Sequence, residues 1–165
     1  MLLFIECIIL CVLFTLMILP AQYKDPINMI MSYPPNIIKR VEQLPQYKGK
    51  IKQREKSHLY KKLIGVFVFV ILLAIIAYCS GCRDFLSAFI HVFTLFFVVN
   101  IYDLVVLDWG IFCHSQKLRI QGTEDMEKDY KDYFFHAKGA VKGIVIGSIV
   151  ALLSGCLVWI VNMFV

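Results

Sequence analysis

The amino-acid sequence predicts an all-α fold: a polytopic membrane protein built as a four-transmembrane-helix bundle, with short interfacial or cytoplasmic helices. Hydrophobic residues make up 59% of the 165 residues, compared with roughly 45–50% in an ordinary globular domain. They occur in four long runs separated by charged segments, the pattern expected of a chain that crosses a bilayer. Two of the separating segments hold 15 of the 17 Lys and Arg residues. We therefore expect a single membrane domain over residues 1–165.

The first predicted span covers residues 2–19 and is expected to end at Pro20. This run resembles the core of a signal peptide, but no basic region precedes it and it contains Glu6. A small-residue cleavage site does not follow it directly. A retained helix is therefore the prediction.

The first long connection, residues 20–62, holds ten Lys or Arg residues and three acids. A short helix is expected from Asn36 to Leu44, stopped by Pro45 and followed by a basic stretch at 48–62. Its apolar residues recur at helical spacing, which favours a helix lying along the membrane surface. A solvated basic linker is the alternative, and both interpretations stay open.

The second span is predicted at 63–79, a tight outer turn at 80–84 and the third span at 85–107. The second connection covers 108–138, and the fourth span covers 139–165. Each of these three spans is about long enough for a hydrocarbon core of roughly 30 Å. Within the second connection, Thr123 is expected to cap a helix from Glu124 to about Lys138.

Lys and Arg concentrate in cytoplasmic loops of membrane proteins. Both long connections are therefore expected in the cytoplasm, with the termini and the 80–84 turn outside, in a plasma or inner cell membrane. Tyr78 and Trp159 would then lie at the outer interface and Trp109 at the inner one. The lipid bilayer is the expected partner; nucleic acid is not, because no reading motif accompanies the positive charge.

Five polar or ionisable residues fall inside the predicted spans: Glu6, His91, Asn100, Asp103 and Lys142. A carboxylate there costs roughly 2.5–3.5 kcal/mol on insertion scales and usually faces a partner or water. Matching depths predict one ion pair between Asp103 and Lys142 and a second between Glu6 and His91. Alternatively, Lys142 reaches the headgroups, Glu6 reaches outer water and His91 bonds a backbone carbonyl.

Candidate catalytic residues gather at the expected inner interface. Carboxylate and imidazole groups are what acid–base chemistry or metal binding requires, and the candidates are Asp103, Asp108, His114 and His136, with Tyr102, Tyr130, Arg119 and Cys113 as neighbours. Their spacing matches no established metal or catalytic signature. The sequence therefore predicts no metal and names no cofactor.

The fourth span carries a stripe of small residues, one every four positions: Gly139, Gly143, Gly147, Ala151 and Gly155. Such spacing lets another backbone approach closely. We expect a helix of the same chain in this groove, while a homodimer or a larger membrane partner stays open.

Cys79 and Cys82 form a CxxC motif in the expected outer turn, where oxidation can occur. The motif, the chain size and the helix count make the protein similar to four-helix membrane enzymes that generate disulfides with a quinone, which implies a redox pair at Cys79 and Cys82. Those enzymes use a second cysteine pair on the same side, whereas Cys113 is expected inside and Cys156 is expected to be buried. The alternative is a turn in which Gly81 supplies backbone freedom and the cysteines are incidental.

Three functional interpretations follow. The first is a small transporter-like protein with an intramembrane polar site on the third span. The second is a membrane-embedded enzyme that acts on a lipid or an apolar small molecule at the cytoplasmic interface. The third is an accessory subunit that packs through the glycine stripe.

Overall fold

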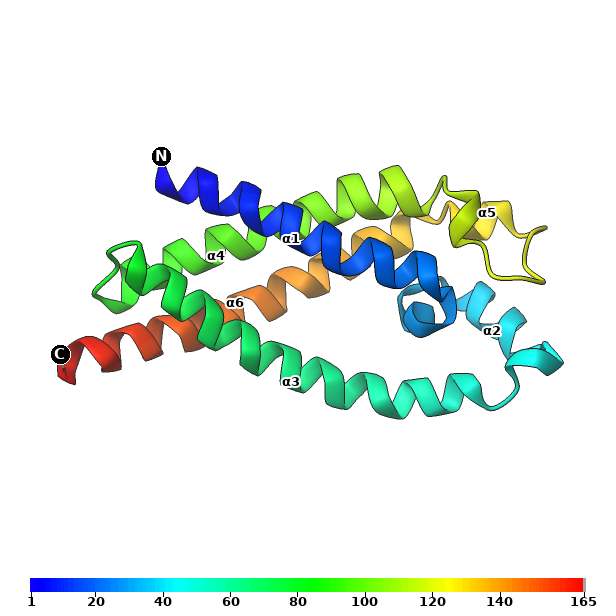
Figure 1. The fold of residues 1–165 in the computed structure, drawn as a ribbon, viewed down its shortest axis with the longest axis horizontal. Coiled ribbons are helices and arrows are strands. Elements are labelled where there is room, and N and C mark those ends of the chain that lie inside the picture. The colour runs from blue at the N-terminus through cyan, green and yellow to red at the C-terminus, as the bar shows by residue number, and fades with distance from the viewer. Residues whose placement is uncertain (165) are drawn as a thin grey trace.

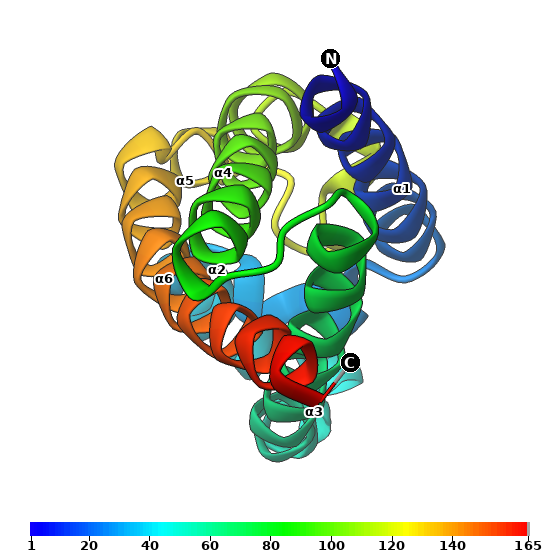
Figure 2. The same ribbon diagram turned by 90° about the vertical axis from the view of Figure 1, so that its left-hand side faces the viewer.

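A computed structural model describes residues 1–164, without the side chains of residues 50, 52–59, 61 and 62. The described chain is helical throughout, with no strand. Its long helices are α1 (Leu2–Lys24), α3 (Lys50–Cys79), α4 (Phe85–Tyr102), which continues as η3 (Asp103–Phe112), and α6 (Tyr133–Phe164). In Figures 1 and 2 these helices run side by side, with α4 between α1 and α6 and with α3 beside α6.

Three helical stretches of the described chain are long and apolar enough to cross a membrane: Leu2–Lys24, Phe85–Phe112 and Glu127–Phe164. Helix α3 adds a shorter apolar segment, Leu63–Cys79. The all-α prediction is confirmed, and a membrane location is supported by these apolar helices. Val165, the predicted last residue of the fourth span, lies outside the described residues.

The helices differ in extent from the predicted segments at three places. Helix α1 continues through Pro20 to Lys24, because a long helix can tolerate the one hydrogen bond that an internal proline removes. Helix α3 begins at Lys50, well before residue 63. The helix predicted from Glu124 is reduced to α5 (Glu127–Tyr130).

Thr123 does not act as the predicted helix cap. Its hydroxyl is buried, donates to the Ile120 carbonyl at 2.7 Å and lies 2.7 Å from the Tyr130 hydroxyl. The chain instead enters α6 at Asp132, whose carboxylate accepts a hydrogen bond from the Phe135 amide at 2.9 Å. This cap explains why α6 starts at Tyr133 and reaches Phe164 without a break.

The long helices share an apolar core. Its buried members come from all four helices and include Cys7, Leu73, Ala77, Ala88, Val92, Leu95, Val150 and Val158. Many other apolar side chains, such as Phe67 and Leu153, point away from the bundle and are exposed. A helix that is apolar on both its inner and outer sides is typical of a chain surrounded by lipid.

The two long connections fold together into one small unit, which we call the connecting cap (residues 25–51 and 112–132). It contains η1 (Pro26–Ser32), α2 (Pro35–Gln43), η2 (Pro45–Tyr47), η4 (Gln116–Leu118) and α5. A second apolar core joins both segments, with Ile30, Tyr33, Ile37, Phe112, Leu118 and Tyr130 buried in it. Both connections therefore end up at the same end of the bundle (Figure 1).

The cap changes the interpretation of the helix expected at 36–44. Ile37 and Val41 of α2 are 0% exposed and pack in the cap core. The apolar face of this helix therefore lies neither on a membrane surface nor in a solvated linker. The side chains of most of the basic stretch at 48–62 lie outside the described residues.

Candidate functional site

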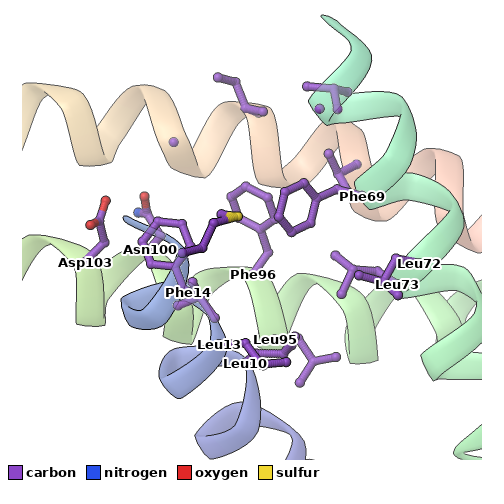
Figure 3. Close-up of a pocket in the computed structure, with 17 residues that line it drawn as sticks. Leu10, Leu13, Phe14, Phe69, Leu72, Leu73, Leu95, Phe96, Asn100 and Asp103 are labelled. Atoms are coloured by element: carbon purple, nitrogen blue, oxygen red, sulfur yellow. The ribbon is translucent and has the colours of Figure 1, made fainter. Parts of the chain in front are cut away.

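A cavity of about 480 Å³ lies between the four long helices (Figure 3). Its volume falls within the range of small-molecule sites, roughly 300–1,000 Å³. Aliphatic and phenylalanine side chains form most of its wall. The lining residues come from α1 (Leu10, Leu13, Phe14, Met17), α3 (Gly65, Val66, Phe69, Leu72, Leu73), α4 and η3 (Leu95, Phe96, Val99, Asn100, Asp103) and α6 (Gly143, Ile146, Val150).

Two polar side chains, Asn100 and Asp103, lie next to each other at one end of this cavity (Figure 3). Asn100 donates a hydrogen bond from Nδ2 to the Ala140 carbonyl at 3.0 Å, which joins α4 to α6. Its Oδ1 lies against Gly143, where an added Cβ would collide with it. Asn100 and Asp103 therefore share the face of the helix that lines the cavity.

The Asp103 carboxylate makes no hydrogen bond or ion pair with any described side chain or backbone group. The predicted ion pair with Lys142 is not formed, because Lys142 is exposed. Lys142 directly precedes Gly143, and successive residues of an α-helix point about 100° apart. Since Gly143 faces α4, Lys142 points away from Asp103.

The segment that carries Asp103 is wound as a π-helix over ten residues, Asp103–Phe112. Its hydrogen bonds join residues five apart, as where the Cys113 amide donates to the Asp108 carbonyl at 2.9 Å. In an α-helix, Asp103 and Asp108 would point about 140° apart. The longer turn of the π-helix instead brings residues five apart towards the same side of the helix, so Asp103 and Asp108 share a side.

Asp108 is paired with His136 of α6, with 3.1 Å between Oδ2 and Nδ1. His136 is 4% exposed and packs edge-on against Phe112 at a centroid distance of 5.0 Å. Three of the four candidate catalytic residues, Asp103, Asp108 and His136, are therefore brought together.

The fourth candidate, His114, lies apart from them. It is exposed, its Nδ1 lies 2.9 Å from the Trp109 carbonyl and its Nε2 lies 3.4 Å from the Tyr133 hydroxyl.

Two of the expected neighbours, Tyr102 and Arg119, also lie apart from the candidate catalytic residues. Tyr102 shares a hydrogen bond of 2.8 Å with Thr15 of α1. Arg119 lies over the Tyr130 ring at 4.0 Å, within the connecting cap.

Glu6 and His91 meet at the other end of the bundle, with 2.8 Å between Oε2 and Nε2. This contact agrees with the pairing predicted from their depths. Ser80 is a third member of this cluster that was not predicted, and its hydroxyl donates to the second oxygen of Glu6. Because Ser80 follows the last residue of α3, the cluster connects α1, α3 and α4.

Helix α4 covers most of the small-residue stripe of α6. A Cβ added at Gly147 would collide with the Phe96 ring, and one at Gly155 would lie 3.0 Å from the Phe85 carbonyl oxygen. Ala151 is fully buried. Gly139 differs, since nothing lies within 4 Å of an added Cβ there.

All six cysteines are free thiols. Cys79 is exposed and Cys82 is half-buried, and burial raises the pKa of the Cys82 thiol. A raised pKa lowers the thiolate fraction on which redox exchange depends. Cys156, expected to be buried, is exposed on the outer side of α6.

The described residues contain no group of three or more His, Cys, Asp or Glu side chains suited to hold a metal ion. No protein-family model, curated protein or solved structure matches this chain. The functional interpretation therefore depends on the geometry of the cavity and of its polar end.

Proposed function

We propose that this protein is a four-pass integral membrane protein that binds an apolar or amphiphilic small molecule in the cavity of its helix bundle. One observation supports the proposal most strongly: a cavity of about 480 Å³ with apolar walls and two polar side chains confined to one end. A pocket of this kind buries the body of a ligand against hydrocarbon and orients it through a few polar contacts.

The arrangement of the chain ends supports four crossings. Both termini and the turn after α3 lie at one end of the bundle, and the connecting cap lies at the other (Figure 1). An even number of crossings gives this arrangement, with Leu63–Cys79 as the shortest span. The Lys and Arg bias supports a connecting cap on the cytoplasmic side of a plasma or inner cell membrane.

Binding fits the geometry better than passage through the bundle does. The cavity has its polar residues at the end near η3, whereas Glu6 and His91 are engaged with each other and with Ser80. The buried residues Val92 and Leu95 of α4 lie between the two ends and are apolar. A transport route for ions would need polar groups along this stretch.

An enzymatic role is the second candidate, and one observation favours it. The paired Asp108 and His136 adjoin Asp103 on a π-helical segment. Carboxylate and imidazole groups within hydrogen-bonding reach are suited to general acid–base chemistry, and π-helical turns occur frequently at functional sites. The substrate would then be the molecule held in the cavity.

An accessory role through the glycine stripe has less support. Gly143, Gly147 and Gly155 are already covered by α4. A homodimer or a larger membrane partner would therefore have to dock on another surface.

Native mass spectrometry of the protein purified in mild detergent tests the proposal, because a bound lipid or other apolar molecule would appear as an added mass. Leu72 lines the cavity from α3, and Ile75 lies on the same helix without lining it; both are partly exposed. We expect Leu72→Trp to remove the added mass and Ile75→Trp to keep it. Leu13→Trp and Leu16→Trp on α1 form a second matched pair, in which only Leu13 lines the cavity. Equal occupancy in all four variants would contradict the proposal.

A further inference from the structure

We propose, on the basis of the proposed function, that the ligand is a lipophilic amine: an apolar body that ends in a protonated amino group held by Asp103 and Asn100. The proposal depends on which atoms the cavity offers at its polar end and on the balance of charge around them.

The polar end offers three acceptor oxygens against one amide hydrogen of Asn100 that stays free, so acceptors predominate there. Asn100 has two donor hydrogens and one acceptor oxygen, and its amide nitrogen already bonds the Ala140 carbonyl. Its oxygen is turned towards Gly143, which lines the cavity. Asp103 adds two carboxylate oxygens that no described group engages. A ligand must therefore bring the hydrogen-bond donor.

The charge balance favours a cation. Asp103 lies on the same π-helical segment as a second carboxylate, Asp108, and among the described side chains the one base paired with either carboxylate is His136, at Asp108. Lys142 is exposed on another face of α6, and Arg119 is engaged by the Tyr130 ring and the Cys113 carbonyl. An ammonium group would neutralise the Asp103 charge where water is scarce, whereas a carboxylate or phosphate headgroup would be repelled.

The remaining wall fits a hydrocarbon body. Beyond Asn100 and Asp103 the cavity is lined by aliphatic and phenylalanine side chains of all four helices, such as Phe14, Phe69 and Phe96 (Figure 3). An alkyl chain attached to the amine would lie against these side chains. The polar end of the cavity therefore favours the amino group of the ligand, and its apolar wall favours the hydrocarbon body.

Three probes with one chain length and different headgroups test the proposal: decylamine, decanol and decanoic acid. Their binding to the purified full-length protein in nanodiscs of a zwitterionic lipid would be measured at pH 7 by the shift of the thermal unfolding midpoint and by native mass spectrometry. We expect decylamine to bind about tenfold tighter than decanol, and decanoic acid to bind weakest, because a charge-assisted hydrogen bond is about twice as strong as a neutral one and like charges repel.

Asp103→Asn keeps the shape of the side chain and removes its charge. It should weaken decylamine binding about tenfold and change decanol binding little. Asp125→Asn, the same substitution at an exposed site in the connecting cap, is the matched control and should change neither. The comparison of the three probes on the unsubstituted protein needs no variant to fold.

The outcomes separate this inference from the function on which it rests. Equal binding of decylamine and decanol, tighter binding of decanoic acid, or unchanged decylamine binding in Asp103→Asn would overturn the amine preference. If Leu72→Trp then still abolished binding of every probe while Ile75→Trp did not, the cavity would remain the binding site. If Leu72→Trp and Ile75→Trp bound every probe equally well, both proposals would fail.

Discussion

Glu6 and Asp103 are both carboxylates inside apolar helices, near opposite ends of the bundle, and their surroundings differ. The Glu6 side chain has a partner for each oxygen, since His91 lies 2.8 Å from one and Ser80 donates to the other. Asp103 has no such partner and faces a cavity. A buried charge is tolerated when it is paired and hydrogen-bonded, and is costly when it is not.

The difference indicates that the two carboxylates have different roles, one structural and one functional. The cluster of Glu6, Ser80 and His91 connects three helices, places a partner beside each Glu6 oxygen and does not line the cavity, so we interpret it as structural. The Asp103 carboxylate lies in an apolar site without a hydrogen bond or ion pair of its own, an arrangement that is expected to lower stability. Residues of this kind are expected where function requires them.

The largest change in the free energy of unfolding is expected at the Glu6–His91 pair. Glu6→Ala should lower the free energy of unfolding by about 3–5 kcal/mol, because it leaves His91 buried without its partner. Unfolding in detergent, followed by circular dichroism, would measure the change. The double variant Glu6→Leu/His91→Leu should recover most of the loss, because an apolar pair of similar size replaces the ion pair. A double variant no more stable than Glu6→Ala would contradict the structural interpretation.

At the cavity, we expect a substitution of Asp103 to raise the free energy of unfolding rather than lower it. Asp103→Leu should raise the free energy of unfolding by about 1–2 kcal/mol, since it removes an unpaired carboxylate from an apolar site. The same unfolding measurement applies, with Asp125→Leu as an exposed control. A loss of stability at Asp103 comparable to that of Glu6→Ala would show that Asp103 has a partner and would remove the contrast between the two sites.

A smaller loss is expected when the third member of the paired cluster is removed. Ser80→Ala deletes one hydrogen bond to a charged group and should lower the free energy of unfolding by about 1 kcal/mol. Ser87→Ala is a useful comparison, because the Ser87 hydroxyl bonds Asp84 in an exposed turn. We expect Ser87→Ala to cost less than Ser80→Ala; the reverse order would weaken the case for the cluster.

The smallest effect is expected at Asn100. Asn100→Leu removes its bond to the Ala140 carbonyl, and hydrogen bonds between membrane helices contribute about 0.6 kcal/mol on average. Ser154→Ala, which removes the bond from the Ser154 hydroxyl to the Val70 carbonyl at 3.0 Å, should cost a similar amount. Near-equal losses in the two variants would show that Asn100 differs from an ordinary helix-packing residue only through its position at the cavity.

Counting residues along the chain predicted the depth of side chains well and their direction less well. Glu6 and His91 share a depth and also meet, so their pairing could be found. Asp103 and Lys142 also share a depth, yet Lys142 points elsewhere, because the close approach of Gly143 to α4 fixes the rotation of α6. Reading the glycine stripe together with Lys142 would have revealed this.

Other features had no signal that pattern analysis could use. The cavity is a volume left between four helices, and no residue spacing encodes a volume. The connecting cap arises from two segments that are far apart in sequence, so the burial of Ile37 against Leu118 could not be foreseen from either one. The π-winding depends on which carbonyl each backbone amide bonds. The hydrophobic pattern of the sequence carries no information about that partner.

Because the segment is π-helical, the number of residues between Asp103 and Asp108 also determines the geometry of the site. A π-turn holds about one residue more than an α-turn, so a single deletion between Asp103 and Asp108 would let an α-helix form with the same apolar surroundings. The two carboxylates would then stand four residues apart and would still share a face, because residues i and i+4 lie on the same side of an α-helix. Conversion of the segment to an α-helix at unchanged length would instead set them about 140° apart, although neither had been replaced. Tolerance to substitution and tolerance to changes in length are therefore separate properties of η3.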